Sequence, residues 1–287
     1  MSDLPIIIAG GGIGGLAAAC GLARKGYKSI VVEQAPQLGE IGAGIQIGPN
    51  AFHCFDYLGV GDEARSKAVY IDSLRLMDAQ SAENITSIPL GEDFRKYFKN
   101  PYAVVHRADL HGVLLEYCEK SPLIEIRTDH IVTGYEQNGT EVSLFVRGRE
   151  PIKGRFLIGA EGLRSPIRGQ MVGDGEPRIS GHTTYRSVIP TDQMPEDLRW
   201  NAATLWAGPK CHIVHYPLKG WKVSIWLSLI TATFKRQLLV GRLREKKLHK
   251  DLSTYTQRSD RLLSMAITGS SGCFVIVNPY QTGLMGA

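Results

Sequence analysis

The feature that most constrains the fold is a glycine-rich segment close to the amino terminus. Residues 6–15 read IIIAGGGIGG, so a short β-branched apolar run precedes glycines at Gly10, Gly12 and Gly15 in GxGxxG spacing. The apolar run suits a buried parallel strand, and the residues after it suit a helix that begins near Ile13. This order of strand, turn and helix predicts the first βαβ unit of a dinucleotide-binding sheet.

Each glycine of this turn has its own expected role. Gly10 permits the tight turn, Gly12 lets the backbone approach a pyrophosphate, and Gly15 lets the helix pack closely on the strand. The first helical residues, Ile13 and Gly14, place their backbone N–H groups where a phosphate would lie. We therefore expect the phosphates of a dinucleotide at the amino end of this helix.

An acidic residue stands where the ribose of such a dinucleotide is expected. A second apolar strand over residues 29–32 ends at Glu33, eighteen residues after Gly15. A carboxylate there accepts hydrogen bonds from ribose hydroxyls and disfavours the additional phosphate of NADP. Gln34 follows it in the same expected site. The motif alone does not distinguish FAD from NAD, and an ordinary βαβ turn is the alternative interpretation.

Length and composition favour a chain with a substantial core. The 287 residues, 43% of them hydrophobic, suit one large or two medium domains. No apolar run reaches the ~18 residues of a membrane span, and the start lacks the basic region of a signal peptide. We expect a cytoplasmic protein without a membrane partner. The five cysteines are odd in number and include no CxxC pair, so neither a disulfide framework nor a metal site is indicated.

The net charge of +5 is concentrated toward the end of the sequence. Residues 1–220 hold 23 basic and 25 acidic side chains, a net charge of −2, whereas residues 221–287 hold 10 and 3, a net charge of +7. Aromatic residues do not alternate with this charge in a pattern typical of nucleic-acid binding. We therefore expect no nucleic-acid partner.

A second glycine-rich stretch, GEIGAGIQIGPN, covers residues 39–50. Its glycine content argues against a helix, and it allows the backbone to approach a flat ligand closely. Ala43, Gly44 and Gln46 are the candidate cofactor-binding residues in it. An irregular surface loop with two turns is the alternative.

Arg107, in the segment VVHRADLH, is a further candidate for contact with a phosphate. It precedes a predicted helix with apolar positions at Leu110, Val113 and Leu114, and Asp109 can help to cap the amino end of that helix. Without other information, an arginine at a helix start is equally compatible with a surface position.

The middle of the chain is predicted to be rich in strands. Residues 124–127, 131–136 and 142–146 suit an antiparallel meander, and residues 155–158 suit a buried strand. That strand leads into GAEGLRSPIR, which by itself reads as a strand followed by a turn.

Three spaced segments, GGGIGG, HRADLH and GAEGLRSPIR, together resemble the FAD-dependent aromatic hydroxylase family, the single-component flavoprotein monooxygenases. The resemblance covers about residues 4–222. It implies FAD as the cofactor, NADH as the reductant, and a small aromatic acid and O2 as substrates. It is strongest to members that convert 3-hydroxybenzoate to 2,5-dihydroxybenzoate (gentisate). An enzyme like salicylate hydroxylase and an inactive FAD-binding remnant are the alternatives, and HRADLH and GAEGLRSPIR disfavour a nicotinamide-only dehydrogenase. Relatives are often dimers, so a homodimer is compatible with the resemblance.

The same resemblance implies roles for four more residues. Glu161 and Gly162 fall in the second FAD motif, where Glu161 replaces the usual Asp. Alternate residues of a strand share a face, so His212 and Tyr216 point the same way on the strand over residues 211–216. The resemblance implies that His212 activates the substrate phenol and that Tyr216 helps to bind the substrate. Read alone, a histidine in an apolar strand is more often structural, and this is the role expected for His215 on the opposite face.

We predict an α/β fold with two domains. A GxGxxG dinucleotide-binding domain covers residues 1–71 and 100–176, and a mainly antiparallel β-sheet substrate domain covers residues 72–99 and 177–230. Residues 231–287 form a tail without assignment. The family's third FAD motif, Gly-Asp followed by Ala-Ala-His-Pro, does not occur in this sequence. We expect a frameshifted or truncated ending that leaves the FAD domain incomplete; a divergent but folded ending is the alternative.

Overall fold

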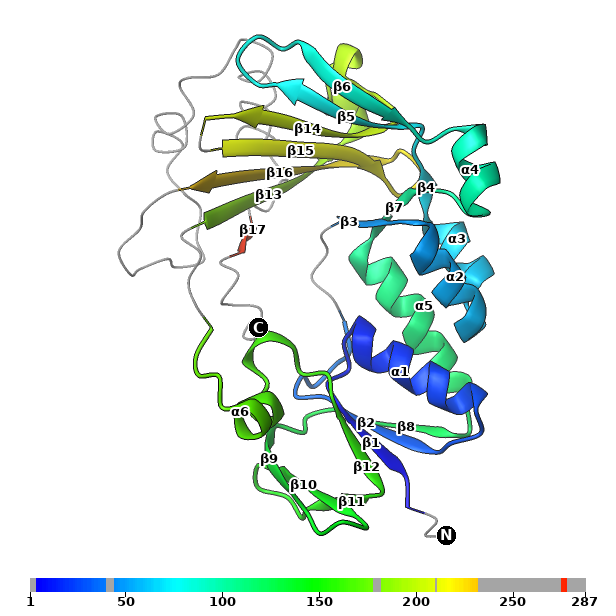
Figure 1. Ribbon diagram of the computed structural model, residues 1–287, viewed down its shortest axis with the longest axis vertical. Helices are drawn as coiled ribbons and strands as arrows, with labels where there is room; N and C mark the ends of the chain where they lie inside the picture. Colours follow the sequence, from blue (N-terminus) through cyan, green and yellow to red (C-terminus); the bar gives the residue numbers. More distant parts are fainter. Residues whose placement is uncertain (1–3, 40–43, 178–181, 210, 232–274, 278–287) are drawn as a thin grey trace.

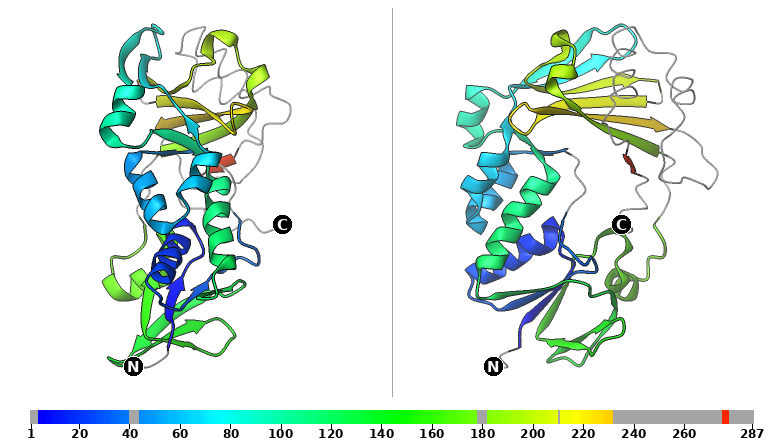
Figure 2. Two further views of the ribbon diagram at one scale, coloured as in Figure 1. Left: turned by 90° about the vertical axis from the view of Figure 1, so that its right-hand side faces the viewer. Right: turned by 180° about the vertical axis from the view of Figure 1, so that it is seen from behind.

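The computed structural model describes residues 4–39, 44–177, 182–209, 211–231 and 275–277. A seven-stranded sheet lies at one end of the molecule and a four-stranded sheet at the other, with helices along one side between them (Figure 1). The same arrangement is visible from behind and from the side (Figure 2). This combination confirms the predicted α/β class.

The four-stranded sheet is entirely parallel, as expected for a dinucleotide-binding sheet. In spatial order its strands are β12 (Phe156–Gly159), β1 (Ile6–Ala9), β2 (Ser29–Val32) and β8 (Ile124–Arg127). The prediction that residues 124–127 belong to an antiparallel meander is wrong, because β8 pairs in parallel with β2. A helix precedes this strand, and a helical connection returns the chain in the parallel direction.

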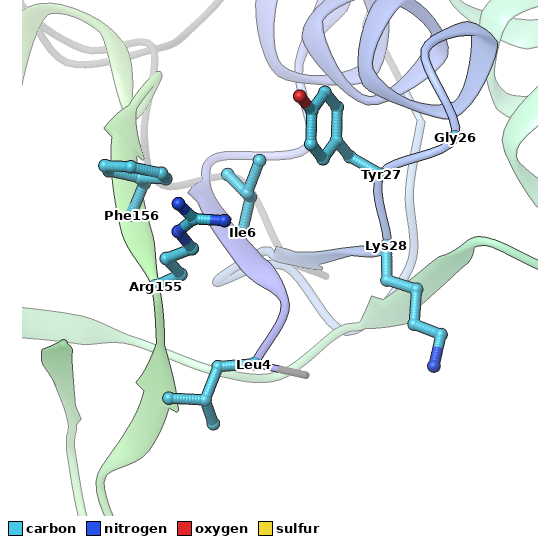
Figure 3. A pocket seen from close by; sticks show the side chains of 7 residues that line it. All are labelled: Leu4, Ile6, Gly26, Tyr27, Lys28, Arg155 and Phe156. Carbon is cyan, nitrogen blue, oxygen red and sulfur yellow. The ribbon is translucent and has the colours of Figure 1, made fainter. Parts of the chain in front are cut away.

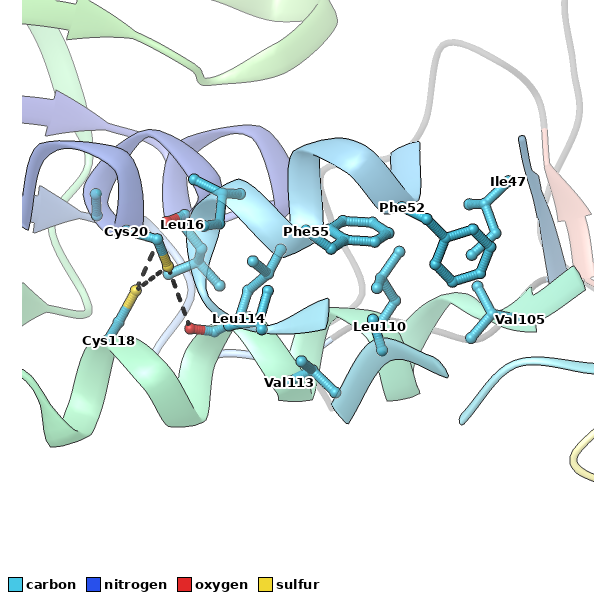
Figure 4. Packing of buried hydrophobic residues seen from close by; sticks show 14 of the residues in the cluster. Leu16, Cys20, Ile47, Phe52, Phe55, Val105, Leu110, Val113, Leu114 and Cys118 are labelled. Carbon is cyan, nitrogen blue, oxygen red and sulfur yellow. Dashed lines mark hydrogen bonds between the residues drawn. The ribbon is translucent and has the colours of Figure 1, made fainter. Parts of the chain in front are cut away.

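Two helices that carry predicted site residues pack against each other beside this sheet. These are α1 (Ile13–Arg24), which follows the glycine turn, and α5 (Arg107–Lys120). Buried Leu16, Leu110 and Leu114 belong to the core between them (Figure 4). The Sγ atoms of the free thiols Cys20 and Cys118 lie 3.6 Å apart at the same interface. Helices α2 (Pro49–Leu58) and α3 (Gly61–Lys67) complete this layer.

A three-stranded antiparallel sheet joins the helical layer to the large sheet. It contains β3 (Gly44–Ile47), β7 (Ala103–His106) and β4 (Val69–Tyr70). Residues 39–50 are therefore not one irregular loop, because their second half forms β3 and the start of α2. The strand depends on pairing with β7, more than fifty residues away, which local sequence does not reveal.

The seven-stranded sheet is antiparallel except for one parallel pair, β14 with β5. Its strands in spatial order are β17 (Val275–Val277), β13 (His182–Pro190), β16 (Val223–Thr231), β15 (Cys211–Leu218), β14 (Ala202–Gly208), β5 (Ser73–Asp78) and β6 (Asn84–Pro89). Helix α4 (Glu92–Phe98) follows β6. The short helices η2 (Thr191–Gln193) and η3 (Glu196–Leu198) connect β13 to β14.

The remaining elements form a small meander beside the parallel sheet. Its strands are β9 (Val132–Gln137), β10 (Val142–Val146) and β11 (Ile152–Gly154), all antiparallel. After β12 the chain forms η1 (Gly162–Arg164) and α6 (Pro166–Val172).

Most of the tail predicted without assignment, residues 231–287, lies outside the described residues. Its one described element, β17, pairs with β13. Within the part of the chain that the structure describes, every helix is too short or too polar to cross a bilayer.

Candidate functional site

The glycine turn has the geometry that the sequence predicts. Gly10 adopts a φ of +107°, and a Cβ atom there would clash with the backbone of Ala160 at the end of β12. A Cβ atom at Gly15 would clash with the carbonyl oxygen of Gly10, because α1 packs directly on the turn. Both positions therefore require glycine for internal packing.

The other glycines of the turn border open space. A Cβ atom at Gly12 or at Gly14 would meet no atom of the described structure within 4 Å. Gly12 is the N-cap of α1 and contributes no side-chain cap, and the first N–H groups of a helix have no intrahelical partner. Ile13 begins the helix beside this space. The turn thus combines backbone donors with room for a phosphate, which fits an adenine dinucleotide.

Glu33 is fixed against this turn at the end of β2. Its Oε2 atom accepts a hydrogen bond of 2.7 Å from the N–H of Gly11, and its Oε1 atom accepts one of 2.9 Å from the N–H of Ala35. A carboxylate offers about four acceptor sites, so others remain for ribose hydroxyls. Gln34 follows as an exposed residue of the same loop.

His111 also contacts the glycine turn, and the sequence analysis did not select it. Its Nε2 atom lies 2.8 Å from the carbonyl oxygen of Gly11, and its side chain is buried. Arg107 is the first residue of α5, and residues four apart share one face of a helix. The sequence did offer a signal for His111, because it is a polar residue one helical turn after Arg107 and next to the apolar Leu110.

Glu161 and Gly162 follow β12, the neighbour of β1. The Oε2 atom of Glu161 accepts a hydrogen bond of 2.8 Å from the hydroxyl of Ser165, and its Oε1 atom lies 3.4 Å from the N–H of Ile167. Gly162 has a φ of +81°, and its Cβ position is open. The carboxylate of Glu161 thus supports the start of α6, at the same sheet edge as the glycine turn.

The second glycine-rich stretch meets the large sheet through Gly44. A Cβ atom at Gly44 would lie 2.6 Å from Cε2 of Tyr216 and 2.9 Å from its hydroxyl oxygen. Gln46, on the exposed side of β3, accepts a hydrogen bond of 2.7 Å from the hydroxyl of Tyr102. Ala43 lies outside the described residues.

His212 and Tyr216 occur on β15 with the alternation that the sequence predicts. Tyr216 is 2% exposed, whereas His212 is half-buried. At ~3.3 Å per residue their Cα atoms are about 13 Å apart along the strand. The two residues thus stand on one face of the same strand, four positions apart.

His215 lies on the other face of β15 and is buried among aromatic rings. Its Nδ1 atom accepts a hydrogen bond of 3.2 Å from Nε1 of Trp206, and its ring lies 5.8 Å from that of Trp200. Burial is the main cause that lowers the pKa of His215 to about 4, while a hydrogen bond with the backbone of Leu198 acts in the opposite direction. These contacts agree with the structural role expected for this residue.

His106 stands directly opposite Gly44 in the pairing of β7 with β3. Burial lowers the pKa of His106, and the positive charge of Lys219 lowers it further. Its Nδ1 atom is 3.9 Å from the carboxylate of Asp109. His106 therefore lies at the junction between the three-stranded sheet and the turn after β15, where burial disfavours its charged form.

A shallow pocket of about 170 Å³ lies at the amino ends of the parallel strands (Figure 3). It is lined by Leu4, Ile6, Gly26, Tyr27, Lys28, Arg155 and Phe156. The glycine turn and Glu33 follow the carboxyl ends of these strands, at the opposite edge of the sheet. This pocket is therefore separate from the candidate dinucleotide site, since ligands of open α/β sheets bind at the carboxyl ends.

Comparison with known proteins identifies several relatives. The chain is 57% identical over 218 residues to 3-hydroxybenzoate 6-hydroxylase 1 of Aquipseudomonas alcaligenes, a match over 76% of this chain and 55% of that protein. It is 50% identical over 219 residues to 3-hydroxybenzoate 6-hydroxylase of Polaromonas naphthalenivorans (strain CJ2), over 76% of this chain and 54% of that protein. The chain thus spans about half the length of these relatives.

Solved structures share the fold at lower sequence identity. Klebsiella pneumoniae HpxO complexed with FAD and uric acid superposes with a TM-score of 0.81 at 21% identity, over 96% of this chain and 68% of that chain. A salicylate hydroxylase substrate complex gives a TM-score of 0.72 at 19% identity, over 91% of this chain and 66% of that chain. These likenesses establish the fold.

The family model described as FAD binding domain matches residues 3–206. This range includes the glycine turn, Glu33, Arg107 and Glu161. The dinucleotide that fits the glycine turn is therefore FAD, which the sequence motif alone did not distinguish from NAD. Because the match covers more than half of the sequence, the chain belongs to the FAD binding domain family.

Proposed function

We propose that the protein is an FAD-dependent monooxygenase that uses NADH and O2 to hydroxylate 3-hydroxybenzoate to 2,5-dihydroxybenzoate. The observation that carries this proposal is the 57% identity over 218 residues to a 3-hydroxybenzoate 6-hydroxylase. The presence of a glycine turn with open space at Gly12 supports it. A homodimer belongs to the same proposal and rests on the resemblance to the family.

The cofactor-binding part of the proposal assigns residues from five segments. The glycine turn and Arg107 would hold the pyrophosphate, Glu33 would hold the ribose, and Glu161 with Gly162 would lie beside them. Gln34 after β2, Ala43, and Gly44 and Gln46 on β3 would border the cofactor. When bound, FAD supplies the transfer of electrons from NADH and the activation of O2, while the protein positions it.

The division into two domains is part of this proposal. Residues 1–71 and 100–176 would form the FAD-binding domain, and residues 72–99 and 177–230 the substrate-binding sheet domain.

The substrate part of the proposal assigns His212 and Tyr216. His212 would accept the proton of the substrate phenol, because a phenolate makes the ring richer in electrons and easier to hydroxylate. An imidazole suits this task since its ordinary pKa lies near neutral pH. The hydroxyl of Tyr216 would hold the other end of the substrate. Both residues lie on one face of β15, which supports their assignment to one substrate site.

The decisive experiment is to record the visible spectrum of the purified chain with FAD, then add 3-hydroxybenzoate and NADH. We expect a bound flavin whose spectrum responds to the substrate, together with NADH oxidation and formation of 2,5-dihydroxybenzoate measured by chromatography. FAD binding without product would contradict the hydroxylase assignment. A different hydroxylated product would change the ring position that is hydroxylated but keep the reaction class.

His212→Ala tests the role of the histidine. We expect hydroxylation to fall by about 10² or more, the usual contribution of a general base, while FAD affinity stays unchanged. His53→Gln on the exposed face of α2 is the matched control and should keep full activity. Loss of FAD from the His212→Ala variant would show that the residue is structural.

A further inference from the structure

The carbonyl oxygen and the N–H of Gly11 both bond to side chains from other parts of the chain. The carbonyl oxygen lies 2.8 Å from Nε2 of His111 on α5, and the N–H donates to Glu33 after β2 over 2.7 Å. A carbonyl oxygen only accepts hydrogen bonds, so Nε2 of His111 carries the proton and donates it. The middle of the glycine turn is therefore held from two sides.

These contacts fix the orientation of two peptide groups. In a planar trans peptide, the carbonyl of one residue and the N–H of the next point in opposite directions. When His111 holds the carbonyl of Gly11, the N–H of Gly12 must point away from α5. The Gly12 position borders the open space where a phosphate fits. The bond from His111 thus fixes the direction of a backbone donor at the edge of that space.

The turn needs such an external constraint because it contains three consecutive glycines. Gly10, Gly11 and Gly12 have no Cβ atoms, so the backbone can adopt many more conformations than other residues allow. Rotation of a single peptide group would turn the Gly12 N–H away from the phosphate position. His111 is 3% exposed, so water does not easily replace it as the donor.

We infer that His111 is a positioning residue for FAD, which orients the glycine turn so that the backbone N–H of Gly12 is directed at the pyrophosphate. The inference rests on the proposed FAD binding and adds a residue to that site. His111 acts through the backbone of Gly11 and does not itself contact the cofactor. Its contribution is preorganisation of the turn before the cofactor binds.

The test compares two variants that differ in their ability to donate. His111→Leu introduces an apolar side chain of similar size without a donor, whereas His111→Gln retains a side-chain N–H donor. Hydrogen–deuterium exchange of the apoprotein should become faster in residues 10–13 of the leucine variant and remain near wild type in the glutamine variant. FAD titration should show a dissociation constant about tenfold higher for leucine, close to the loss of one buried hydrogen bond.

A variant on the same helix provides the control. Val113 is buried in the core beside α5 and makes no hydrogen bond through its side chain, so Val113→Ala should lower stability without changing exchange in residues 10–13 or FAD affinity (Figure 4). Should His111→Leu fail to fold, His111→Ala provides a second variant without a donor.

Several outcomes would overturn the inference. Unchanged exchange in the leucine variant, equal behaviour of leucine and glutamine, or the same effects from Val113→Ala would each reduce His111 to a packing residue. If the wild-type chain binds no FAD, the proposed cofactor binding fails, while the exchange comparison in the apoprotein still decides whether His111 orients the turn.

Discussion

Gly44 at the start of β3 lies directly against the ring of Tyr216 on β15. A Cβ atom at residue 44 would come within 2.6 Å of Cε2 and 2.9 Å of the hydroxyl oxygen of this tyrosine. The absence of a side chain at Gly44 therefore allows the large sheet to approach β3, the strand within the second glycine-rich stretch. In the proposed enzyme, this contact fixes a substrate-binding tyrosine next to the cofactor-binding loop.

Gly44→Ala should disturb this contact. The added methyl group must displace the ring of Tyr216, so we expect a loss of about 1–3 kcal/mol in unfolding free energy from overpacking and weaker binding of 3-hydroxybenzoate. Urea unfolding and substrate titration measure the two effects. Gly112→Ala in α5 is the control, because its Cβ position is open and alanine favours a helix by about 0.5–1 kcal/mol. If Gly44→Ala left both quantities unchanged, the close approach to Tyr216 would be excluded.

Alanine at Gly15 should mainly lower stability, whereas alanine at Gly12 should mainly weaken FAD binding. Gly15→Ala places a methyl group against the backbone of Gly10, so we expect the apoprotein to lose about 3 kcal/mol or more. Gly12→Ala projects into open space, so the apoprotein should lose less than about 1 kcal/mol while FAD binding weakens. Thermal unfolding without FAD and fluorescence titration with FAD separate the two effects. Equal stability losses in both variants would contradict the assigned geometry.

Replacement of Glu33 should weaken FAD binding more than it weakens folding. Glu33→Gln keeps one acceptor oxygen, so one of the two bonds from Gly11 and Ala35 is lost together with the negative charge. We expect an FAD dissociation constant about tenfold higher. Glu125→Gln, a half-exposed carboxylate on β8, is the control with unchanged affinity. An effect of the same size in both variants would point to general electrostatics.

The buried His215 predicts a pH-dependent stability. Its pKa of about 4 in the folded state lies below the ordinary value of 6.5, so the unfolded state binds more protons between these two values. This contribution is complete above about pH 6.5 and is lost as the pH falls toward 4, by at most about 3 kcal/mol. Urea unfolding between pH 7 and pH 4 measures this slope.

His215→Gln isolates this contribution, because the amide can still pair with Trp206 but does not titrate. The slope of unfolding free energy against pH should be flatter for this variant than for the wild type. Parallel curves for the two proteins would assign the acid sensitivity to other groups.

Local sequence rules were sufficient for the dinucleotide turn. The β-branched run, the glycine spacing and Glu33 lie within one βαβ unit, so their geometry follows from strand and helix periodicity over about thirty residues. The turn itself is described as predicted, with Gly10 and Gly15 required by packing and Gly12 open. The roles of His212 and Tyr216 stay predictions, although β15 places both on one face.

Tertiary structure decided the contacts between segments that are far apart in the sequence. Because β3 pairs with β7, part of the predicted loop over residues 39–50 is a strand. Because β8 pairs with β2, residues 124–127 belong to the parallel sheet and not to the predicted meander. In both cases the partner strand, which local pattern does not specify, determines the outcome.

The sequence by itself determined the dinucleotide-binding unit and the identity of the residues in it, because backbone sterics and side-chain periodicity act locally. Only the tertiary structure brought His111 to Gly11, one hundred residues away, and Tyr216 to Gly44. Those contacts depend on how helices and sheets pack, and packing is set by the whole core instead of by neighbours in the chain.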